Sequence, residues 1–282
     1  MRWIAAALVE IRHEFPAQPH PGAAKVLVGL LAATVLLGAF FWTLESLWPE
    51  DRGQPSWRGA SSRTDLFYWV FDFFVNRRIV GASLFLAVLI LALLHVPRAT
   101  IGIARLPLWL QVPLMLLLGD LIGYWVHRAM HRSALLWRFH AVHHSSVRLD
   151  WLASARVHPL ESVVSKLAAA IPMFLLGFAP GLTAVYAPFL GIYPIFLHCN
   201  LDWGYGKLGY AISSPAFHRW HHAADLEARD RNFSGLFPVF DYLFGTAYFP
   251  RGRHPQRYGV DGEPMPAALL PQLAYSFRRP RV

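Results

Sequence analysis

The sequence has very little cysteine, because its 282 residues include only Cys199. One thiol cannot form a disulfide within the chain, so a fold stapled by disulfides is excluded. A zinc site built on cysteine needs several thiolates, so a site of that kind is excluded as well. Any metal that the chain binds must therefore be held by nitrogen and oxygen ligands.

Charged residues are also scarce. They make up 15% of the chain, against about 25% of an ordinary soluble domain, and 55% of the residues are hydrophobic. Uncharged runs cover 26–44 and 79–96, and a third run over 106–126 is interrupted only by Asp120. Each run is close to the roughly 20 residues that cross a bilayer as a helix. The composition predicts an integral membrane protein with several spans.

A fourth apolar block covers 167–197, and its 31 uncharged residues are too many for one span and too few for two. The turn dipeptide Pro180-Gly181 lies near the middle of this block. We expect a helical hairpin that enters the bilayer and returns, which brings Ser162 and His198 to the same side of the membrane. A single straight span would separate His198 from the histidines that precede the block.

Histidine is abundant and strongly clustered. Nine of the 14 histidines fall into three short clusters and one position directly after the fourth apolar block. Two histidines three or four residues apart on a helix present both rings on one face, so each cluster can chelate a metal. We therefore predict a multinuclear metal site at the ends of the spans. The predicted ligands are His127, His131, His140, His143, His144, His198, His218, His221 and His222.

The chemistry of these residues narrows the choice of metal. Imidazole suits iron, zinc, copper and nickel, whereas magnesium and calcium prefer oxygen ligands. A four-coordinate ion needs at most four histidines, so nine imply two metals. The clusters contain no carboxylate, which disfavours a hydrolytic zinc pair, and His13-Glu14 lacks the second histidine of a zinc protease helix. Redox-active iron fits best, with a non-catalytic or hydrolytic di-zinc membrane protein as the alternative.

The net charge of +9 is better explained by a membrane than by nucleic acid, so we expect no nucleic acid partner. Basic residues near the membrane interact with anionic lipid headgroups and fix the orientation of the spans. By the positive-inside rule, the clusters face the cytoplasm. The arginines that flank them are Arg128, Arg132, Arg138, Arg148, Arg156, Arg219, Arg229 and Arg231.

Motifs that include these histidines resemble those of a known family. The segments are 120–131 (DLIGYWVHRAMH), 136–146 (LWRFHAVHHSS), 218–222 (HRWHH), 232–233 (NF) and 241–246 (DYLFGT). Together they resemble the fatty acid hydroxylase and sterol desaturase superfamily of membrane di-iron oxygenases. The resemblance divides the chain into N-terminal membrane spans and loops (1–110), a catalytic domain (111–255) and a C-terminal tail (256–282).

The resemblance implies an all-α fold, in which a membrane stem of about four spans, one of them the hairpin, carries a cytoplasmic cap of metal-binding helices. The nine histidines would hold two non-haem irons, with His198 completing one coordination sphere. The implied reaction is hydroxylation or desaturation of a C–H bond in a fatty acyl or sterol-like lipid. It uses O2 and electrons from a separate ferredoxin-like or cytochrome-like donor.

Further polar residues could support the metals. Metal-binding histidines usually donate their second ring N–H to a carboxylate or carbonyl. His158 could bind metal, cap a helix at Pro159 or pair with Glu161, and Asp120 lies two helical turns from His127 on the same face. The candidates for a metal-binding or supporting role are His158, Asp120, Glu161, Asn200, Asn232 and Asp241, with Asp202 as a further carboxylate.

Overall fold

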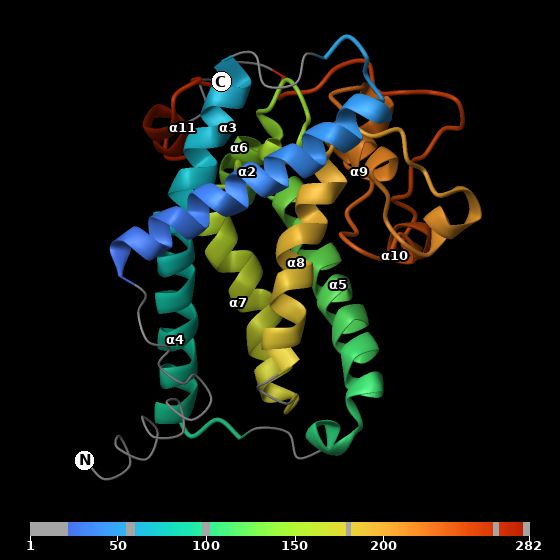
Figure 1. The fold of residues 1–282 in the computed structure, drawn as a ribbon. Helices are drawn as coiled ribbons and strands as arrows, with labels where there is room; N and C mark the ends of the chain where they lie inside the picture. The colour runs from blue at the N-terminus through green and yellow to red at the C-terminus, as the bar shows by residue number, and fades with distance from the viewer. Residues whose placement is uncertain (1–21, 55–59, 98–101, 179–181, 262–264, 279–282) are drawn as a thin grey trace.

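The computed structural model describes residues 22–54, 60–97, 102–178, 182–261 and 265–278. Helices and loops make up these ranges, which contain no strand beyond an isolated bridge between Ala223 and Tyr258. The predicted all-α fold is confirmed. Figure 1 shows two parts, a stem of long helices and a cap at one end of it.

The stem contains α4 (Arg77–Leu93), α5 (Leu108–Arg132), α7 (Pro159–Leu175) and α8 (Leu182–His198). They lie side by side and extend in one direction from the cap (Figure 1). α3 (Ala60–Phe71) continues into α4 through a π-helical turn, Asp72–Asn76, so that 61–93 is long and apolar enough to cross a membrane, as is 108–132. Phe85, Leu86 and Leu117 are exposed on the outside of the stem. Their exposure fits lipid contact, and the chain is an integral membrane protein.

The fourth apolar block forms the predicted hairpin. α7 ends at Leu175 and α8 begins at Leu182, whereas Pro180 and Gly181 themselves lie outside the described residues. Gly177 adopts φ 76°, a left-handed conformation that glycine reaches without steric cost. α8, whose last residue is His198, consequently ends at the cap end of the stem (Figure 1).

The first apolar run forms α2 (Ala23–Leu47), but this helix does not run along the stem. Figure 1 shows it crossing the cap end of the stem helices at a steep angle. Its inner side is tied down, because Trp69 Nε1 donates to Thr34 Oγ1 at 2.8 Å and the ring of Phe41 stacks on Trp151 at 6.0 Å. The length and hydropathy of α2 suit a span, so the number of spans stays a prediction.

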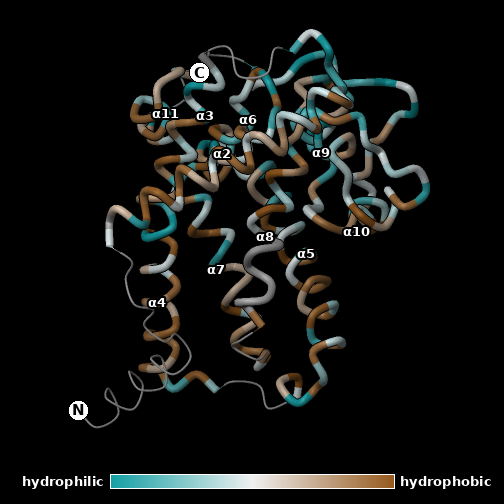
Figure 2. Tube along the Cα trace, in the orientation of Figure 1, coloured by the Kyte–Doolittle hydropathy of each residue, from teal (hydrophilic) through white to brown (hydrophobic). Residues whose placement is uncertain are grey.

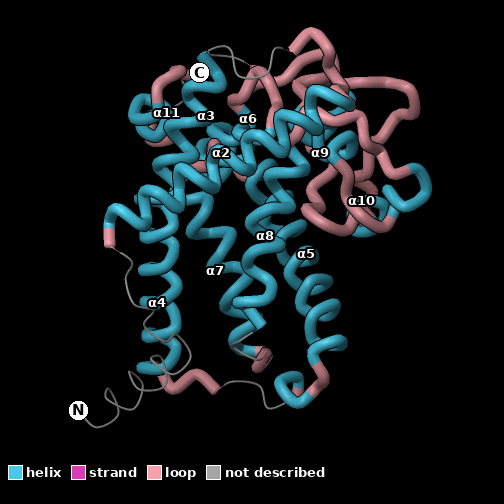
Figure 3. The backbone as a smooth tube through the Cα atoms, in the orientation of Figure 1, coloured by secondary structure: helices cyan, strands magenta, loops and turns pink. Residues whose placement is uncertain are grey.

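Loops occupy as much of the cap as helices do (Figure 3). Its helices are α6 (Ala134–His144), α9 (Pro215–His222), α10 (Val239–Leu243) and α11 (Leu269–Tyr275). Short turns of other helix types cover Trp151–Ala155, Gly206–Tyr210 and Leu226–Ala228, and a further one, Ile103–Arg105, precedes α5. Hydrophilic residues gather in the loops of the cap, whereas the stem helices consist mostly of hydrophobic residues (Figure 2).

Side-chain caps fix where the histidine-bearing helices begin. Ser133 follows the last residue of α5 and accepts the N–H of Leu136. α6 therefore begins at Ala134, with a single residue between the two helices. Ser214 accepts the N–H of Phe217 at the start of α9, where Pro215 occupies the first helical position. Such caps satisfy backbone donors that have no partner inside the helix. The two caps thus fix where the second and third histidine clusters lie along their helices.

Asp120 joins the stem to the cap. It is buried in α5, and its carboxylate accepts the backbone N–H groups of Gly235, Leu236 and Phe237 at 3.0, 2.8 and 2.7 Å. Its expected role beside His127 is therefore wrong, since the ring of His127 bonds to the carbonyl of Phe233 instead. The helical register was correct, but the carboxylate turns toward three loop donors that only the folded chain supplies.

The Asp120→Asn variant should lower the free energy of unfolding by about 1–3 kcal/mol, because an amide NH2 would face buried N–H donors. Denaturant titration of the detergent-solubilised protein, followed by helical circular dichroism, measures this loss. Asp202→Asn makes the same chemical change at an exposed cap position and is the matched control. Equal denaturation midpoints for the two variants would contradict the assignment.

Candidate metal centre

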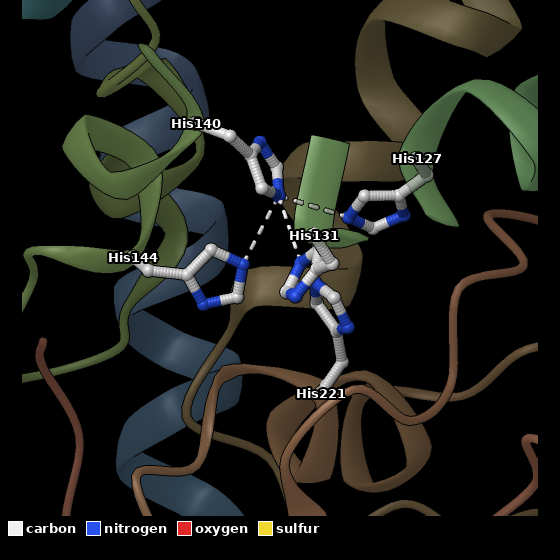
Figure 4. Close-up of side chains that lie close together, drawn as sticks. All are labelled: His127, His131, His140, His144 and His221. Carbon is white, nitrogen blue, oxygen red and sulfur yellow. Dashed lines mark hydrogen bonds between the residues drawn. The ribbon is translucent and has the colours of Figure 1, made fainter. Parts of the chain in front are cut away.

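All nine histidines predicted as ligands lie together in the cap, in two adjoining groups. The first group draws on α5, α6 and α9, and one ring nitrogen from each member lies within 4.8 Å of those of the others. Figure 4 shows the rings pointing toward a common centre. The members of the first group are His127, His131, His140, His144 and His221.

The second group draws on α6, α8 and α9 and meets the same distance criterion. It touches the first group, because the rings of His144 and His222 stack with centroids 4.5 Å apart. α6 supplies both groups from the adjacent residues His143 and His144. The members of the second group are His143, His198, His218 and His222.

The Nε2 atoms meet at very short distances. In the first group, His140 Nε2 lies 3.1 Å from the Nε2 atoms of three other rings. In the second group, the Nε2 atom of His198 lies 3.2 Å from that of His143 and 3.3 Å from that of His218. A neutral imidazole has one N–H and one lone pair, so the position of each proton decides whether these are hydrogen bonds.

Backbone carbonyls fix the position of the ring proton in four of the histidines. A carbonyl only accepts, so the Nδ1 atom that faces it must carry the proton and Nε2 must carry the lone pair. The Nδ1-to-oxygen distances range from 2.7 to 3.1 Å. The four pairs are His127 with Phe233, His143 with Arg156, His198 with Pro194, and His221 with Arg231.

These protons leave lone pairs directed at one another. His143 Nε2 and His198 Nε2 are both acceptors, so their separation of 3.2 Å is no hydrogen bond. His221 Nε2 is buried, and among the described residues it has no hydrogen-bond partner. Facing lone pairs and an unpartnered buried nitrogen are costly unless a cation binds between them. The two groups therefore fit two metal ions, one with up to five and one with up to four imidazole ligands.

Carboxylates support the first group from behind. Glu161, at the start of α7, lies with Oε1 2.8 Å from Nδ1 of His140, as expected of a supporting residue. Asp230 Oδ1 lies 3.3 Å from Nδ1 of His131, and the Asp230 side chain is 45% exposed. A carboxylate at the second ring nitrogen fixes the tautomer and raises the basicity of a ligating histidine. These two carboxylates would offset part of the charge of a bound cation.

Two other predicted supporting residues shape the loop that follows α9. Asp241 accepts the N–H groups of Phe233 and Ser234 at 2.7 and 2.9 Å. Asn232 adopts φ 57°, donates to the carbonyl of Phe217 at 3.0 Å and accepts the N–H of Tyr248 at 2.7 Å. Neither side chain reaches a histidine ring in these bonds. They instead hold the backbone whose carbonyls, at 231 and 233, accept from two rings of the first group.

The remaining candidates lie outside both histidine groups. His158 caps α7, because its Nδ1 accepts the N–H of Leu160 at 3.1 Å, so of the three predicted roles the helix cap is observed. Glu161 pairs with His140 rather than with His158. Asn200 bonds to the backbone N–H and carbonyl of Asp51, both at 3.0 Å, which fastens the end of α8 to the segment after α2. The metal-binding interpretations of His158 and Asn200 have no support in this geometry.

Residues 112–246 match the family model for fatty acid hydroxylases. The chain is 35% identical to an ornithine lipid hydroxylase of Rhizobium tropici over 178 residues, which are 61% of this chain and 52% of that protein. The matched region, which is just under half of the chain, is similar to the fatty acid hydroxylase family. The matched region contains all nine histidines of the two groups.

Two further proteins are similar over shorter segments. An alkylglycerol monooxygenase of Caenorhabditis elegans is 28% identical over 141 residues, which are 50% of this chain and 28% of that protein. A very-long-chain aldehyde decarbonylase of Oryza sativa subsp. indica is 32% identical over 140 residues, which are 45% of this chain and 21% of that protein. The chain thus spans about half of the first relative and less of the others. No solved structure matches the chain.

Support for the two histidine groups also comes from α3, outside the region that the family model matches. Arg156, whose carbonyl accepts from His143, is buried, and its guanidinium bonds to Asp65 at 2.6 Å and to the carbonyl of Ser61 at 3.0 Å. Sequence reasoning missed Arg156 and Asp230 as supporting residues, since neither lies at a chelating spacing from a histidine. The only signal was the closeness of Asp230 to the third cluster.

Burial keeps the rings of the two histidine groups neutral. Loss of contact with water lowers the pKa of the α6 and α9 histidines, and the neighbouring rings lower it further for most of them. The pKa of His143 falls to about 4 for the same main reason. Neutral imidazole is the form that binds metal. The site is therefore ready for a cation at pH 7 without first releasing protons.

The Glu161→Gln variant should bind metal in the first group about 10–100-fold more weakly, because supporting partners contribute about that much to affinity. Competition with a chromophoric chelator measures the affinity. Glu227→Gln, an identical change at an exposed cap residue, is the matched control. If both variants retain the wild-type affinity, Glu161 does not support a metal.

Acid should destabilise the metal-free protein. The unfolded chain takes up protons near the ordinary histidine pKa of 6.5, whereas folded His143 does so only near 4. The unfolded state binds more protons in this window, so stability should fall as the pH drops from about 6.5 toward 4. Melting temperatures of chelator-treated protein across these pH values measure the slope. His143→Gln should flatten it, whereas His254→Gln, which removes a half-exposed ring, should not.

Proposed function

We propose that this chain is a membrane-bound, non-haem di-iron oxygenase that hydroxylates or desaturates a C–H bond of a lipid. One observation carries the proposal: within each of two histidine groups, Nε2 atoms of different rings lie 3.1–3.3 Å apart, and His143 and His198 direct lone pairs at each other. The nine histidines named above are the proposed ligands. The relatives, a lipid hydroxylase, an alkylglycerol monooxygenase and an aldehyde decarbonylase, support a lipid as the substrate.

Two ferrous ions, when bound, supply the reduction of dioxygen and the cleavage of an unactivated C–H bond. Hydroxylation consumes the lipid, O2, two electrons and two protons and yields the alcohol and water. Desaturation consumes the same reagents and yields an alkene and two waters. The electrons come from a separate donor of the ferredoxin or cytochrome kind, and the arginines near the clusters would attract an acidic protein.

The chain's own residues position the metals and exclude water. Carbonyls fix four rings in the tautomer that ligates, and the carboxylates of Glu161 and Asp230 balance charge at the first group. The ring of Trp137 covers this group, with centroids 5.1 Å from His131 and 5.4 Å from His144. The histidines' burial keeps the centre dry, which strengthens every charge interaction inside it.

An open apolar hollow suits a hydrocarbon chain. It measures about 250 Å³ and lies between α2 and α8, where its lining includes Phe40, Ile192 and Phe196. Phe196 is two residues before His198 on α8. The flanking arginines support a cytoplasmic orientation of the cap by the positive-inside rule. In this arrangement a lipid would reach the metals from the bilayer rather than from the aqueous side.

Metal analysis combined with lipid mass spectrometry tests the proposal. We expect two irons per chain in protein from iron-replete cells, and in those cells a lipid with one added oxygen or two fewer hydrogens. His143→Ala should abolish the product, whereas His254→Ala, at a half-exposed histidine outside both groups, should retain it. Less than one metal per chain, two zinc ions with no lipid oxidation, or a fully active His143→Ala would overturn it.

A further inference from the structure

The cap carries an apolar patch on its stem side. Six large hydrophobic residues from three separate segments of the chain are each at least 41% exposed there. Two of them form a ring pair that joins the segments, since the centroids of Tyr210 and Tyr242 lie 5.1 Å apart. We call this surface the α10 patch; it consists of Trp125, Leu208, Tyr210, Val239, Tyr242 and Leu243.

The α10 patch continues the membrane-facing surface of the stem. Trp125 belongs to α5, which is apolar and long enough to cross a bilayer, and its ring lies 4.9 Å from that of Phe244 at the end of α10. Figure 1 shows α10 on the side of the cap that faces the stem, beside the upper part of α5. The surface that lipid covers on α5 therefore runs on to α10 without a break.

The composition of the patch is that of a membrane interface. Trp and Tyr favour the headgroup level of a bilayer, where an apolar ring and a polar edge are both satisfied. Cations lie at its edge: the Arg128 guanidinium sits 5.4 Å from the centre of the Trp125 ring, and Lys207 is exposed next to Leu208. Such cations can pair with headgroup phosphates.

We propose that the α10 patch inserts into the interface of the bilayer that holds the stem, with its apolar side chains among the upper acyl chains. The inference rests on the membrane stem and not on the proposed oxygenase activity. It gives α10 a second role, because Asp241 on the same short helix is buried and holds the loop that bonds to His127. Bilayer contact would thus fix the depth of the metal centre above the lipid.

Depth-dependent fluorescence quenching tests the proposal on the full-length chain. A thiol-reactive fluorophore is placed at Leu243→Cys, and the protein is reconstituted in phosphatidylcholine vesicles that contain lipids with a nitroxide near the headgroup. The native Cys199 is fully buried, so wild-type protein should take up no label and serves as the blank. No metal or turnover is needed, so a failure of the oxygenase assay leaves this readout intact.

Matched positions define the outcome. Leu226 is 69% exposed, like Leu243 at 70%, but lies in the cap between Asp225 and Glu227, and Leu117 on α5 is 45% exposed. We expect the label at 243 to be quenched severalfold more than the label at 226, and at least as strongly as the label at 117, which lies about 12 Å deeper along α5 than Trp125. Equal quenching at 243 and 226 would overturn the proposal. Weak quenching at 243 together with contact between labels of two chains would overturn it too, because a second copy would then cover the patch.

Discussion

Facing lone pairs at the centre of the cap are the constraint on which the remaining structure depends. Nine imidazoles from α5, α6, α8 and α9 form two groups whose ring nitrogens lie within 4.8 Å of one another, and the nearest pairs are only 3.1–3.3 Å apart. Without a cation the arrangement is repulsive, so the surrounding chain must force the rings together. Helix caps, carbonyl acceptors and buried carboxylates all act on the orientation of these rings.

Contacts between residues far apart in the sequence hold many of these rings in place. The loop over 231–234 supplies two carbonyls to the first group, and it is held in turn by Asp241 and by the left-handed turn at Asn232. Asp120 fastens the next three residues to the stem. Hydrogen bonds in a dry interior are strong and costly to break, so stem and cap behave as one unit around the centre.

The sequence predicted those features that show helical spacing of residues or an apolar run of characteristic length. Histidine pairs at helical spacing identified eight of the nine rings, and a 31-residue apolar block with Pro180-Gly181 near its middle identified the hairpin that returns His198 to them. It could not reveal that α2 crosses the stem, because hydropathy measures the length of an apolar run and not its direction. It also missed the support from Asp230 and the carbonyl of Arg156, since a backbone acceptor has no residue signature. Asp120 was misassigned for a related reason: its loop partners are 115 to 117 residues away in sequence.

The adjacency of His143 and His144 has a geometric consequence. Consecutive residues of a helix point about 100° apart, so His143 and His144 of α6 point into different groups. His221 and His222 of α9 do the same. The separation of the two centres is therefore built into two helical backbones, not into a bridging carboxylate, which neither histidine group contains among the described residues. A bridge held by side chains can lengthen or swing during a reaction, whereas a helical turn cannot. The two helices therefore fix the distance between the two histidine groups, and any ligand that contacts both groups must fit that distance.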